Sequence, residues 1–231
     1  MALPSKITDM HRRTYLRSVA ATGAAVSAAG CLGSLGDSNP NVALSEPDRN
    51  VESSDLPYPA WGEKIPDVTI PAPLEDRTVS FRDVETPSIV TFFYTHCMTI
   101  CPVLISTLRN VQTHATKNGY AKDVTFLPTT FDPQRDDAEQ LRAYTDKMNV
   151  DQSIDDWSFL RPKSEERAKH VITDTFGVQF EKTKQKSKDD YMFSHSALIL
   201  LVNEKGYVER AYHGTSPKQQ QIIDDLETVR G

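Results

Sequence analysis

Two of the three cysteines in the chain, Cys97 and Cys101, are separated by three residues. They follow an apolar run that ends at Tyr94, and apolar residues recur at helical spacing from Cys101 onward, so the pair lies where a strand turns into a helix. Residues four apart on a helix share one face, with Cβ atoms roughly 5–6 Å apart. The two sulfurs could therefore form a disulfide or bind one metal ion, and the positive end of the helix dipole favours their thiolate forms.

Two thiolates seldom complete a metal site, and the histidines are the natural source of a third ligand. His195 precedes the most hydrophobic run of the chain, residues 197–202, which places its imidazole in a loop beside a central strand. Position alone leaves open whether His195 is a ligand or a structural histidine. His96 adjoins Cys97 and could tune the pKa of that thiol.

The chain from about residue 57 onward alternates between strand and helix patterns. Short apolar runs predict strands at 88–94, 123–130 and 157–160, and a hairpin formed by 197–202 and 207–212. Helical spacing predicts helices that begin at Cys101, at Asp136 with Glu139 as a capping box, at Ser164 and at Ser216. This order predicts an α/β fold in which helices on both faces flank a mixed sheet, with a C-terminal β-hairpin and helix. A domain of about 175 residues needs no disulfide or structural metal for stability, so the cysteine pair is free for chemistry.

The first thirty residues resemble a twin-arginine signal peptide, because Arg12 and Arg13 precede a mildly apolar stretch of small residues, 18–30. A floppy basic terminus is the alternative. The small residues before Cys31 resemble a lipobox, which implies that this cysteine becomes the first mature residue and is acylated; an unmodified cysteine is the alternative. Each buried lipid CH₂ contributes roughly 0.8 kcal/mol, so such a lipid would anchor the protein on the outer face of the cytoplasmic membrane without a spanning helix.

Two further segments lack the periodicity of helices or strands. Residues 31–56 contain many turn formers and predict a flexible tether between the anchor and a domain that covers residues 57–231. Residues 181–190 are rich in lysine and predict a solvated loop.

The composition excludes two classes of protein. Of the 231 residues 38% are hydrophobic and 25% charged, and no apolar run reaches the roughly 18 residues that span a bilayer, so a polytopic membrane protein is ruled out. The net charge of −6 argues against binding to nucleic acid or anionic lipid through bulk charge, because those partners select basic surfaces.

Three segments together resemble the signatures of the Sco/SenC family of copper proteins. They run from Tyr94 to Pro102, from Phe131 to Asp136 and from Ser194 to Ser196, and the resemblance extends over about Trp61 to Gly231. It implies a thioredoxin-like fold and copper bound by Cys97, Cys101 and His195. It also implies delivery of copper to the binuclear copper centre of cytochrome c oxidase, or preparation of the thiols of that centre. Asp132 matches an acidic residue near the copper site in that family, and a turn residue before Pro133 is the alternative.

The chain departs from the family's pattern at two positions beside the expected ligands. Met98 stands where proline is common, and its thioether could bind Cu(I) transiently or fill a gap in the packing. Ser194 stands where aspartate is common, which puts the tuning of His195 by a neighbouring carboxylate in doubt. The ligand set is unchanged, and two thiolates with one imidazole suit copper as Cu(I) or Cu(II). Zinc would ordinarily require a fourth ligand, and a blue-copper site a second histidine.

The sequence thus predicts an extracytoplasmic, membrane-tethered copper chaperone, a metallochaperone rather than an enzyme. Its expected partners are the copper-centre subunit of cytochrome c oxidase and an extracytoplasmic thiol reductant, because oxidation of the thiols would remove two ligands. The main alternative is a thioredoxin-like thiol–disulfide oxidoreductase, with Cys97 and Cys101 as its redox-active thiols. Such proteins have two residues between the cysteines and a proline before a later strand, whereas this chain has three residues and no proline between Pro162 and Pro217. An inert structural disulfide is a third alternative.

Overall fold

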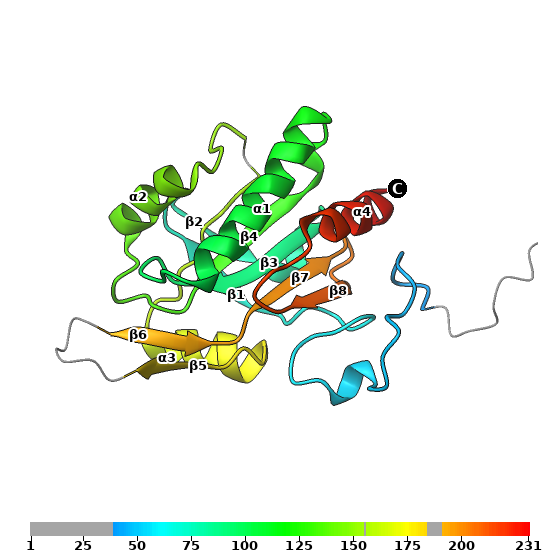
Figure 1. The fold of residues 1–231 in the computed structure, drawn as a ribbon, viewed down its shortest axis with the longest axis horizontal. Coiled ribbons are helices and arrows are strands. Elements are labelled where there is room, and N and C mark those ends of the chain that lie inside the picture. The colour runs from blue at the N-terminus through cyan, green and yellow to red at the C-terminus, as the bar shows by residue number, and fades with distance from the viewer. Residues whose placement is uncertain (1–38, 155, 184–190) are drawn as a thin grey trace, which may run out of the picture. The chain divides into compact units, whose positions relative to one another are not determined.

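The computed structural model describes residues 39–154, 156–183 and 191–231. A four-stranded mixed sheet with the order β4-β3-β7-β8 forms its centre (Figure 1). The strands are β3 (Ser88–Phe93), β4 (Thr125–Thr130), β7 (Leu198–Val202) and β8 (Val208–His213). β3 pairs in parallel with β4 and antiparallel with β7, and β7 pairs antiparallel with β8. Every residue of β3 and β7 is buried, as expected for a sheet that is covered on both faces.

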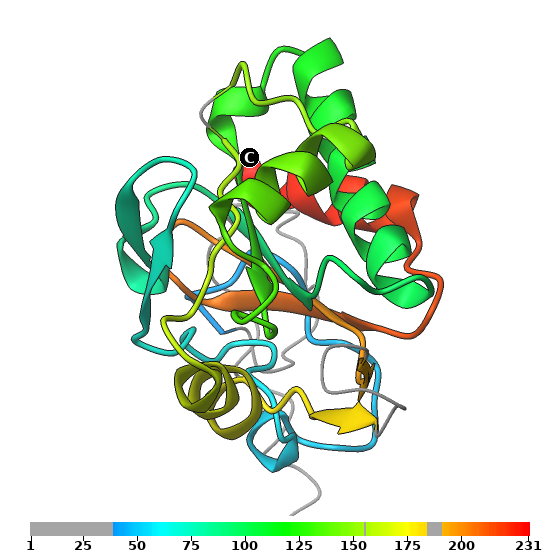
Figure 2. The ribbon, with the colours of Figure 1, turned by 90° about the vertical axis from the view of Figure 1, so that its left-hand side faces the viewer.

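Helices cover both faces of the sheet (Figure 1 and Figure 2). On one face lie α1 (Ile100–Lys117), α2 (Ala138–Met148) and α4 (Gln219–Arg230), and on the other lie α3 (Glu165–Ala168) and the π-helix η4 (Lys169–Thr175). Phe93 stacks on Tyr144 of α2, whereas its neighbour Phe92 contacts Phe176 after η4, because successive residues of a strand point to opposite faces. The expected mixed sheet with helices on both faces and a C-terminal hairpin and helix is confirmed. Within the described ranges, no helix combines the length and the apolar character that crossing a bilayer requires.

Two small hairpins lie outside the central sheet. β1 (Thr69–Ala72) pairs with β2 (Arg77–Ser80), and β5 (Phe180–Thr183) pairs with β6 (Met192–His195). The described residues also form short 3-10 helices, η1 (Ser53–Asp55), η2 (Phe81–Asp83) and η3 (Ala121–Asp123). The sequence patterns predict neither hairpin, since strands of four residues carry little periodicity. The prediction of a loop at 181–190 is wrong for residues 181–183, which belong to β5. Residues 184–190 lie outside the described ranges.

α2 begins at a different cap from the one that the sequence predicts. The side chain of Asp137 accepts a hydrogen bond from the backbone N–H of Gln140 and caps the helix, whereas Asp136 is fully buried. The carboxylate of Asp136 instead accepts hydrogen bonds from the backbone N–H of Thr95 and from the hydroxyls of Thr95 and Thr130. A buried carboxylate is stable only when donors surround it, so tertiary contacts rather than the helix determine the role of Asp136.

The segment expected to form a third strand, 157–160, makes two isolated parallel bridges to β4. Phe126 is bridged to Trp157, and Thr129 is bridged to Leu160. Pro128 lies between the two bridges and has no N–H to donate, so the hydrogen-bond ladder is interrupted there. The helix expected after Ser164 also differs, because it begins as α3 and continues as the π-helix η4.

Residues 39–45, part of the expected flexible tether, are bound to the turn end of the β7–β8 hairpin. Glu209 of β8 is fully buried, and its carboxylate accepts hydrogen bonds from the backbone N–H groups of Ala43 and Leu44, each at 2.9 Å. The side-chain amide of Asn203 donates to the same carboxylate at 2.6 Å. Because the buried carboxylate requires these donors, the structure differs from the expectation here and fixes this stretch on the domain. The expected signal peptide, Cys31 and the start of the tether lie outside the described residues.

Gly177 follows η4 in left-handed backbone, with a φ of 69°. A Cβ at this position would lie 1.8 Å from the carbonyl oxygen of Pro57. Gly177→Ala is therefore expected to lower the free energy of unfolding by about 3 kcal/mol or more, because backbone strain adds to a clash with main-chain atoms. Urea denaturation measures this loss. Gly119→Ala is the matched control, since φ there is 77° but no atom lies within 4 Å, and should cost only about 1 kcal/mol. Equal losses for the two variants would contradict the close approach of Pro57.

Candidate metal centre

The pairing of β3 with β7 brings together two segments that are distant in the chain. One is the loop after β3, and the other is the end of β6, where His195 lies rather than in the expected loop. The strands are antiparallel, with Thr91 opposite Ile199, and the hydroxyl of Thr91 donates to the carbonyl oxygen of Leu198 at 2.8 Å. The end of β3 therefore lies beside the start of β7. Cys97 follows β3 and His195 precedes β7, so both residues lie at the same end of the sheet.

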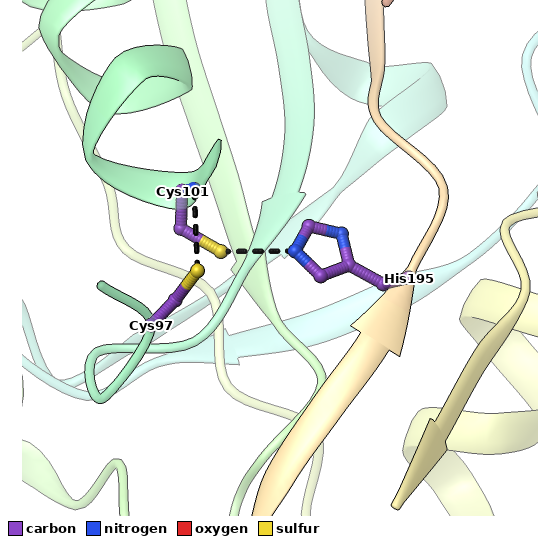
Figure 3. Close-up of side chains that lie close together, drawn as sticks. All are labelled: Cys97, Cys101 and His195. Atoms are coloured by element: carbon purple, nitrogen blue, oxygen red, sulfur yellow. Dashed lines mark hydrogen bonds between the residues drawn. The ribbon is translucent and has the colours of Figure 1, made fainter. Parts of the chain in front are cut away.

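Cys97, Cys101 and His195 form a compact group at this end of the sheet (Figure 3). The Sγ of Cys101 lies 3.3 Å from Nε2 of His195, and the backbone N–H of Cys101 donates to Sγ of Cys97 at 3.4 Å. The two sulfurs and the ring nitrogen all lie within 4.8 Å of one another. Cys97 is 2% exposed and Cys101 is 0% exposed, and neither forms a disulfide. In the part of the chain that the structure describes, no other three His, Cys, Asp or Glu side chains are grouped closely enough to hold one metal ion.

The hydrogen bonds of His195 leave Nε2 free to act as a ligand. Nδ1 lies 3.1 Å from the carbonyl oxygen of Ser196, which can only accept, so the proton of the neutral ring is on Nδ1. The lone pair on Nε2 then faces the thiol of Cys101. A metal ion between these atoms would replace the thiol proton, and the imidazole would keep its tautomer.

The two thiols differ in acidity, so the expectation that both favour the thiolate form is wrong for Cys101. A hydrogen bond from the thiol of Cys101 is the main cause that lowers the pKa of Cys97 to about 3, and hydrogen bonds from the backbone N–H of Cys101 and from the hydroxyl of Thr99 add to it. Burial is the main cause that raises the pKa of Cys101, and the neighbouring Cys97 adds to it. At neutral pH the pair therefore holds one proton, on Cys101. Burial also raises the pKa of Tyr94 to about 12, so its hydroxyl stays neutral.

The lowered pKa of Cys97 predicts that the reduced, metal-free protein becomes more stable as pH rises from the acid into the neutral range. An unfolded thiol has a pKa of about 8.5, so between the two pKa values the unfolded state binds more protons than the folded state. The free energy of unfolding should rise with pH by at most about 1.4 kcal/mol per unit, and this contribution is lost when acid protonates the folded thiolate. The raised pKa of Cys101 acts in the opposite direction, but only above about pH 8.5.

Urea denaturation between about pH 5 and pH 8 measures this dependence. Cys97→Ser removes the titrating group and should flatten the slope, whereas Cys31→Ser should leave it as it is. If the slope of Cys97→Ser matched that of the unmodified protein, the lowered pKa of Cys97 would be refuted.

A buried ion pair fixes the start of β6, the strand that ends at His195. Asp132 is fully buried and accepts hydrogen bonds from Nε of Arg135 and from the hydroxyl of Tyr191, both at 2.6 Å. Arg135 also donates to the carbonyl oxygen of Tyr191 at 2.9 Å, and its guanidinium lies 3.6 Å from the centre of the aromatic ring of Tyr191. We call Asp132, Arg135 and Tyr191 the β6 clamp. It holds both the side chain and the backbone of the residue directly before β6.

Aromatic rings support the other end of β6. The ring of Phe131 lies 5.0 Å from that of His195, and the ring of Tyr94 lies 6.2 Å from it, edge to face. The hydroxyl of Tyr94 accepts a hydrogen bond from the backbone N–H of Phe193 at 3.2 Å. β6 does not pair with the central sheet, so the imidazole is positioned by these rings, by the β6 clamp and by the pairing of β6 with β5, in which Phe180 lies opposite His195.

The sequence analysis singled out His96 and Asp132 beside the expected ligands. The polar contacts of their side chains are with residues other than Cys97, Cys101 and His195. Nδ1 of His96 lies 3.0 Å from the hydroxyl of Thr95 and 3.9 Å from the carboxylate of Asp136. Asp132 belongs to the β6 clamp. Through β6, Asp132 acts on the position of the histidine rather than on a metal ion directly.

Three residues that support the site are not predicted by sequence reasoning: Tyr94, Arg135 and Tyr191. Tyr94 and Arg135 lie inside the segments that carry the family resemblance, and this position in the motifs could have identified them. Tyr191 precedes His195 by four residues, and only the packing of β6 against the loop after β4 reveals its contact with Asp132.

Comparison with known proteins assigns the family. The model of the SCO1/SenC family matches residues 75–230, which include both cysteines and His195. The chain belongs to the SCO1/SenC family. A relative, a SCO2-like protein of Rickettsia typhi, is 25% identical over 134 residues, 57% of this chain and 62% of the relative. The SCO1/SenC chain thus spans less than two thirds of the length of this relative.

Solved structures share the fold of this SCO1/SenC protein. A SCO1/SenC family lipoprotein from Bacillus anthracis superposes with a TM-score of 0.61 at 21% identity, over 74% of this chain and 96% of that one. ScoI of Bradyrhizobium japonicum with copper bound gives a TM-score of 0.58 at 22% identity, over 70% and 96%. These structures confirm the thioredoxin-like fold that the resemblance implies.

Proposed function

We propose that this SCO1/SenC protein binds one copper ion through Cys97, Cys101 and His195 and passes it to a partner protein. The observation that carries the proposal is the group of two sulfurs and one imidazole nitrogen within 4.8 Å at one end of the sheet. Copper bound to ScoI of Bradyrhizobium japonicum, which shares this fold, supports the choice of metal.

The donor set fits copper as a cargo. Thiolates favour Cu(I) and an imidazole helps to stabilise Cu(II), and three ligands leave room for an incoming ligand, so copper can leave by ligand exchange. Cys97 is already a thiolate at neutral pH, and Cys101 loses its proton on loading. Copper binding should therefore release about one proton per ion.

The acceptor that we propose is the copper-centre subunit of cytochrome c oxidase, which would receive the metal or have its thiols reduced before loading. Because oxidation of Cys97 and Cys101 would remove two ligands, an extracytoplasmic thiol reductant is a second proposed partner. The protein then acts as a metallochaperone and not as an enzyme.

A lipid on Cys31 is part of the proposal, with residues 1–30 as a twin-arginine signal peptide. It would place the domain on the outer face of the cytoplasmic membrane. Support comes from the sequence pattern and from the Bacillus anthracis relative, which is described as a lipoprotein.

Thiol–disulfide exchange with a partner protein is the less favoured function. The acidic Cys97 beside the buried Cys101 is the observation in its favour, because a thiolate next to a second thiol can attack a disulfide and be released from it. This function requires neither the imidazole of His195 near the sulfurs nor the orientation of its Nε2 toward them.

Anaerobic copper titration of the reduced full-length chain tests the proposal. The unmodified protein should bind one equivalent, with thiolate-to-copper charge-transfer absorption, and His195→Ala should weaken binding by at least about tenfold because a ligand is lost. His170→Ala is the matched control, since this exposed histidine pairs with Asp174 on η4 and should leave binding unchanged.

Three outcomes of this titration lead to different conclusions. No copper bound by the unmodified protein, with ready exchange of a disulfide between the two cysteines, would favour the oxidoreductase. Equal affinity for the unmodified protein and His195→Ala would exclude the histidine as a required ligand. Weaker copper binding in His195→Ala, with unchanged binding in His170→Ala, would support the copper carrier.

A further inference from the structure

Met98 directly follows Cys97 and is 81% exposed. The sequence leaves open whether this methionine fills a gap in the packing or offers its sulfur to a metal. Its exposure excludes the first role, because a side chain that faces solvent fills no gap. Among the described residues, the exposed large apolar side chains are Met98, Val103 and Val51, and the first two of these lie on either side of Cys101.

The other sulfur-bearing side chains of the described residues face inward. Cys97 and Cys101 are 2% and 0% exposed, and Met148 in α2 is 8% exposed. Met192 is partly buried, and its Sδ lies 3.7 Å from the hydroxyl of Tyr94. Within the described ranges, Met98 therefore carries the exposed sulfur, and it does so next to the buried Cys97 of the Cys97–Cys101–His195 group.

We infer that Met98 is the entry and exit ligand for Cu(I), holding the ion through its thioether at the surface before and after Cys97, Cys101 and His195 hold it. The inference rests on the proposed copper function. A thioether is a soft, neutral ligand that suits Cu(I) but binds it more weakly than a thiolate does. Such a ligand can accept the ion from outside and release it inward.

The transfer is a series of ligand exchanges in which copper remains Cu(I). A bond from copper to the donor breaks as the bond to Sδ of Met98 forms, and the thiolate of Cys97 then displaces that thioether. The thiol of Cys101 gives its proton to water as its sulfur binds, and Nε2 of His195 completes the set. Release follows the same steps in reverse, so Met98 lowers the barrier in both directions and leaves the equilibrium nearly unchanged.

Stopped-flow transfer of Cu(I) between a coloured Cu(I) chelate and the reduced full-length chain tests the inference. Met98→Leu keeps the size and apolar character of the side chain and removes only the sulfur. It should slow loading and release alike, by about tenfold, and change the affinity for Cu(I) by less than about twofold. Met148→Leu makes the same substitution at a buried sulfur on α2 and should leave both rates unchanged.

The outcomes separate this inference from the proposed function. If the unmodified protein bound no copper, the proposed function and the inference would both fail. If it bound copper and Met98→Leu kept both rates, only the inference would be overturned. A tenfold loss of affinity in Met98→Leu would also overturn it, because Met98 would then be a permanent ligand. Slower loading and release at nearly unchanged affinity would support it.

Discussion

Replacement of Cys101 by serine is expected to weaken the binding of Cu(I) by more than about 100-fold while the protein stays folded. Cys101 lies at the centre of the group, with its Sγ 3.3 Å from Nε2 of His195 and its N–H donating to Sγ of Cys97. Serine keeps the size of the side chain and the backbone N–H, but it replaces a soft sulfur by a hydroxyl oxygen that Cu(I) does not favour. One thiolate and one imidazole then remain.

Competition with a Cu(I) chelator, under anaerobic conditions and on the reduced full-length chain, measures this loss. Circular dichroism of the metal-free variants verifies that they are folded. Cys31→Ser is the matched control, because it makes the same substitution at the third cysteine and should leave the affinity unchanged. An affinity of Cys101→Ser within about tenfold of the unmodified protein would show that this sulfur is not a ligand.

The same variant separates the two functions. A thiol–disulfide oxidoreductase that attacks through the thiolate of Cys97 needs Cys101 to release its partner. Cys101→Ser would then accumulate a mixed disulfide with a partner protein. A copper carrier predicts instead that the variant loses copper and that no such adduct forms.

Asp132→Asn is expected to lower the free energy of unfolding by about 3–5 kcal/mol, because the guanidinium of Arg135 loses its counter-ion in a buried setting. Asp132 is fully buried, and the side chain of Arg135 is 18% exposed. The amide can still accept from the hydroxyl of Tyr191 but cannot balance the charge. Copper affinity should also fall, because the β6 clamp no longer fixes the strand that carries His195.

Urea denaturation and chelator competition on the same samples measure the two effects. Tyr191→Phe removes one hydroxyl from the clamp and leaves the ion pair, so it should cost only about 1–2 kcal/mol. Asp137→Asn is the matched control, because asparagine caps α2 as well as aspartate does, and it should change neither quantity. A cost for Asp132→Asn as small as that of Asp137→Asn would mean that the ion pair does not hold the strand.

The sequence by itself determined the order of the main elements and singled out the three residues that the structure groups, Cys97, Cys101 and His195. Strands β3, β4 and β7 were predictable because each is a short apolar run, and helices α1, α2 and α4 because each carries apolar residues at a spacing of three or four. The sequence also predicted Cys97 and Cys101 at a strand-to-helix turn, but the helical spacing assumed for them is wrong, because α1 begins at Ile100 and Cys97 lies in the loop before it. The structure brings these cysteines and His195 together as predicted. His195, however, was predicted as a ligand from the family resemblance and not from its position in the sequence.

Only the tertiary structure decided how the histidine, the carboxylates and the exposed methionine act. His195 meets the cysteines because β3 and β7 are neighbours, and it stays there because Asp132 and Arg135 hold β6. Asp136 accepts hydrogen bonds from Thr95 and Thr130 instead of capping a helix. Glu209 accepts hydrogen bonds from the backbone of Ala43 and Leu44 instead of facing water. Local spacing reports only which residues share a face of one element. Which donor reaches a buried carboxylate, and which side chain faces water, depends on contacts between residues far apart in the chain, and those exist only once the elements are packed together.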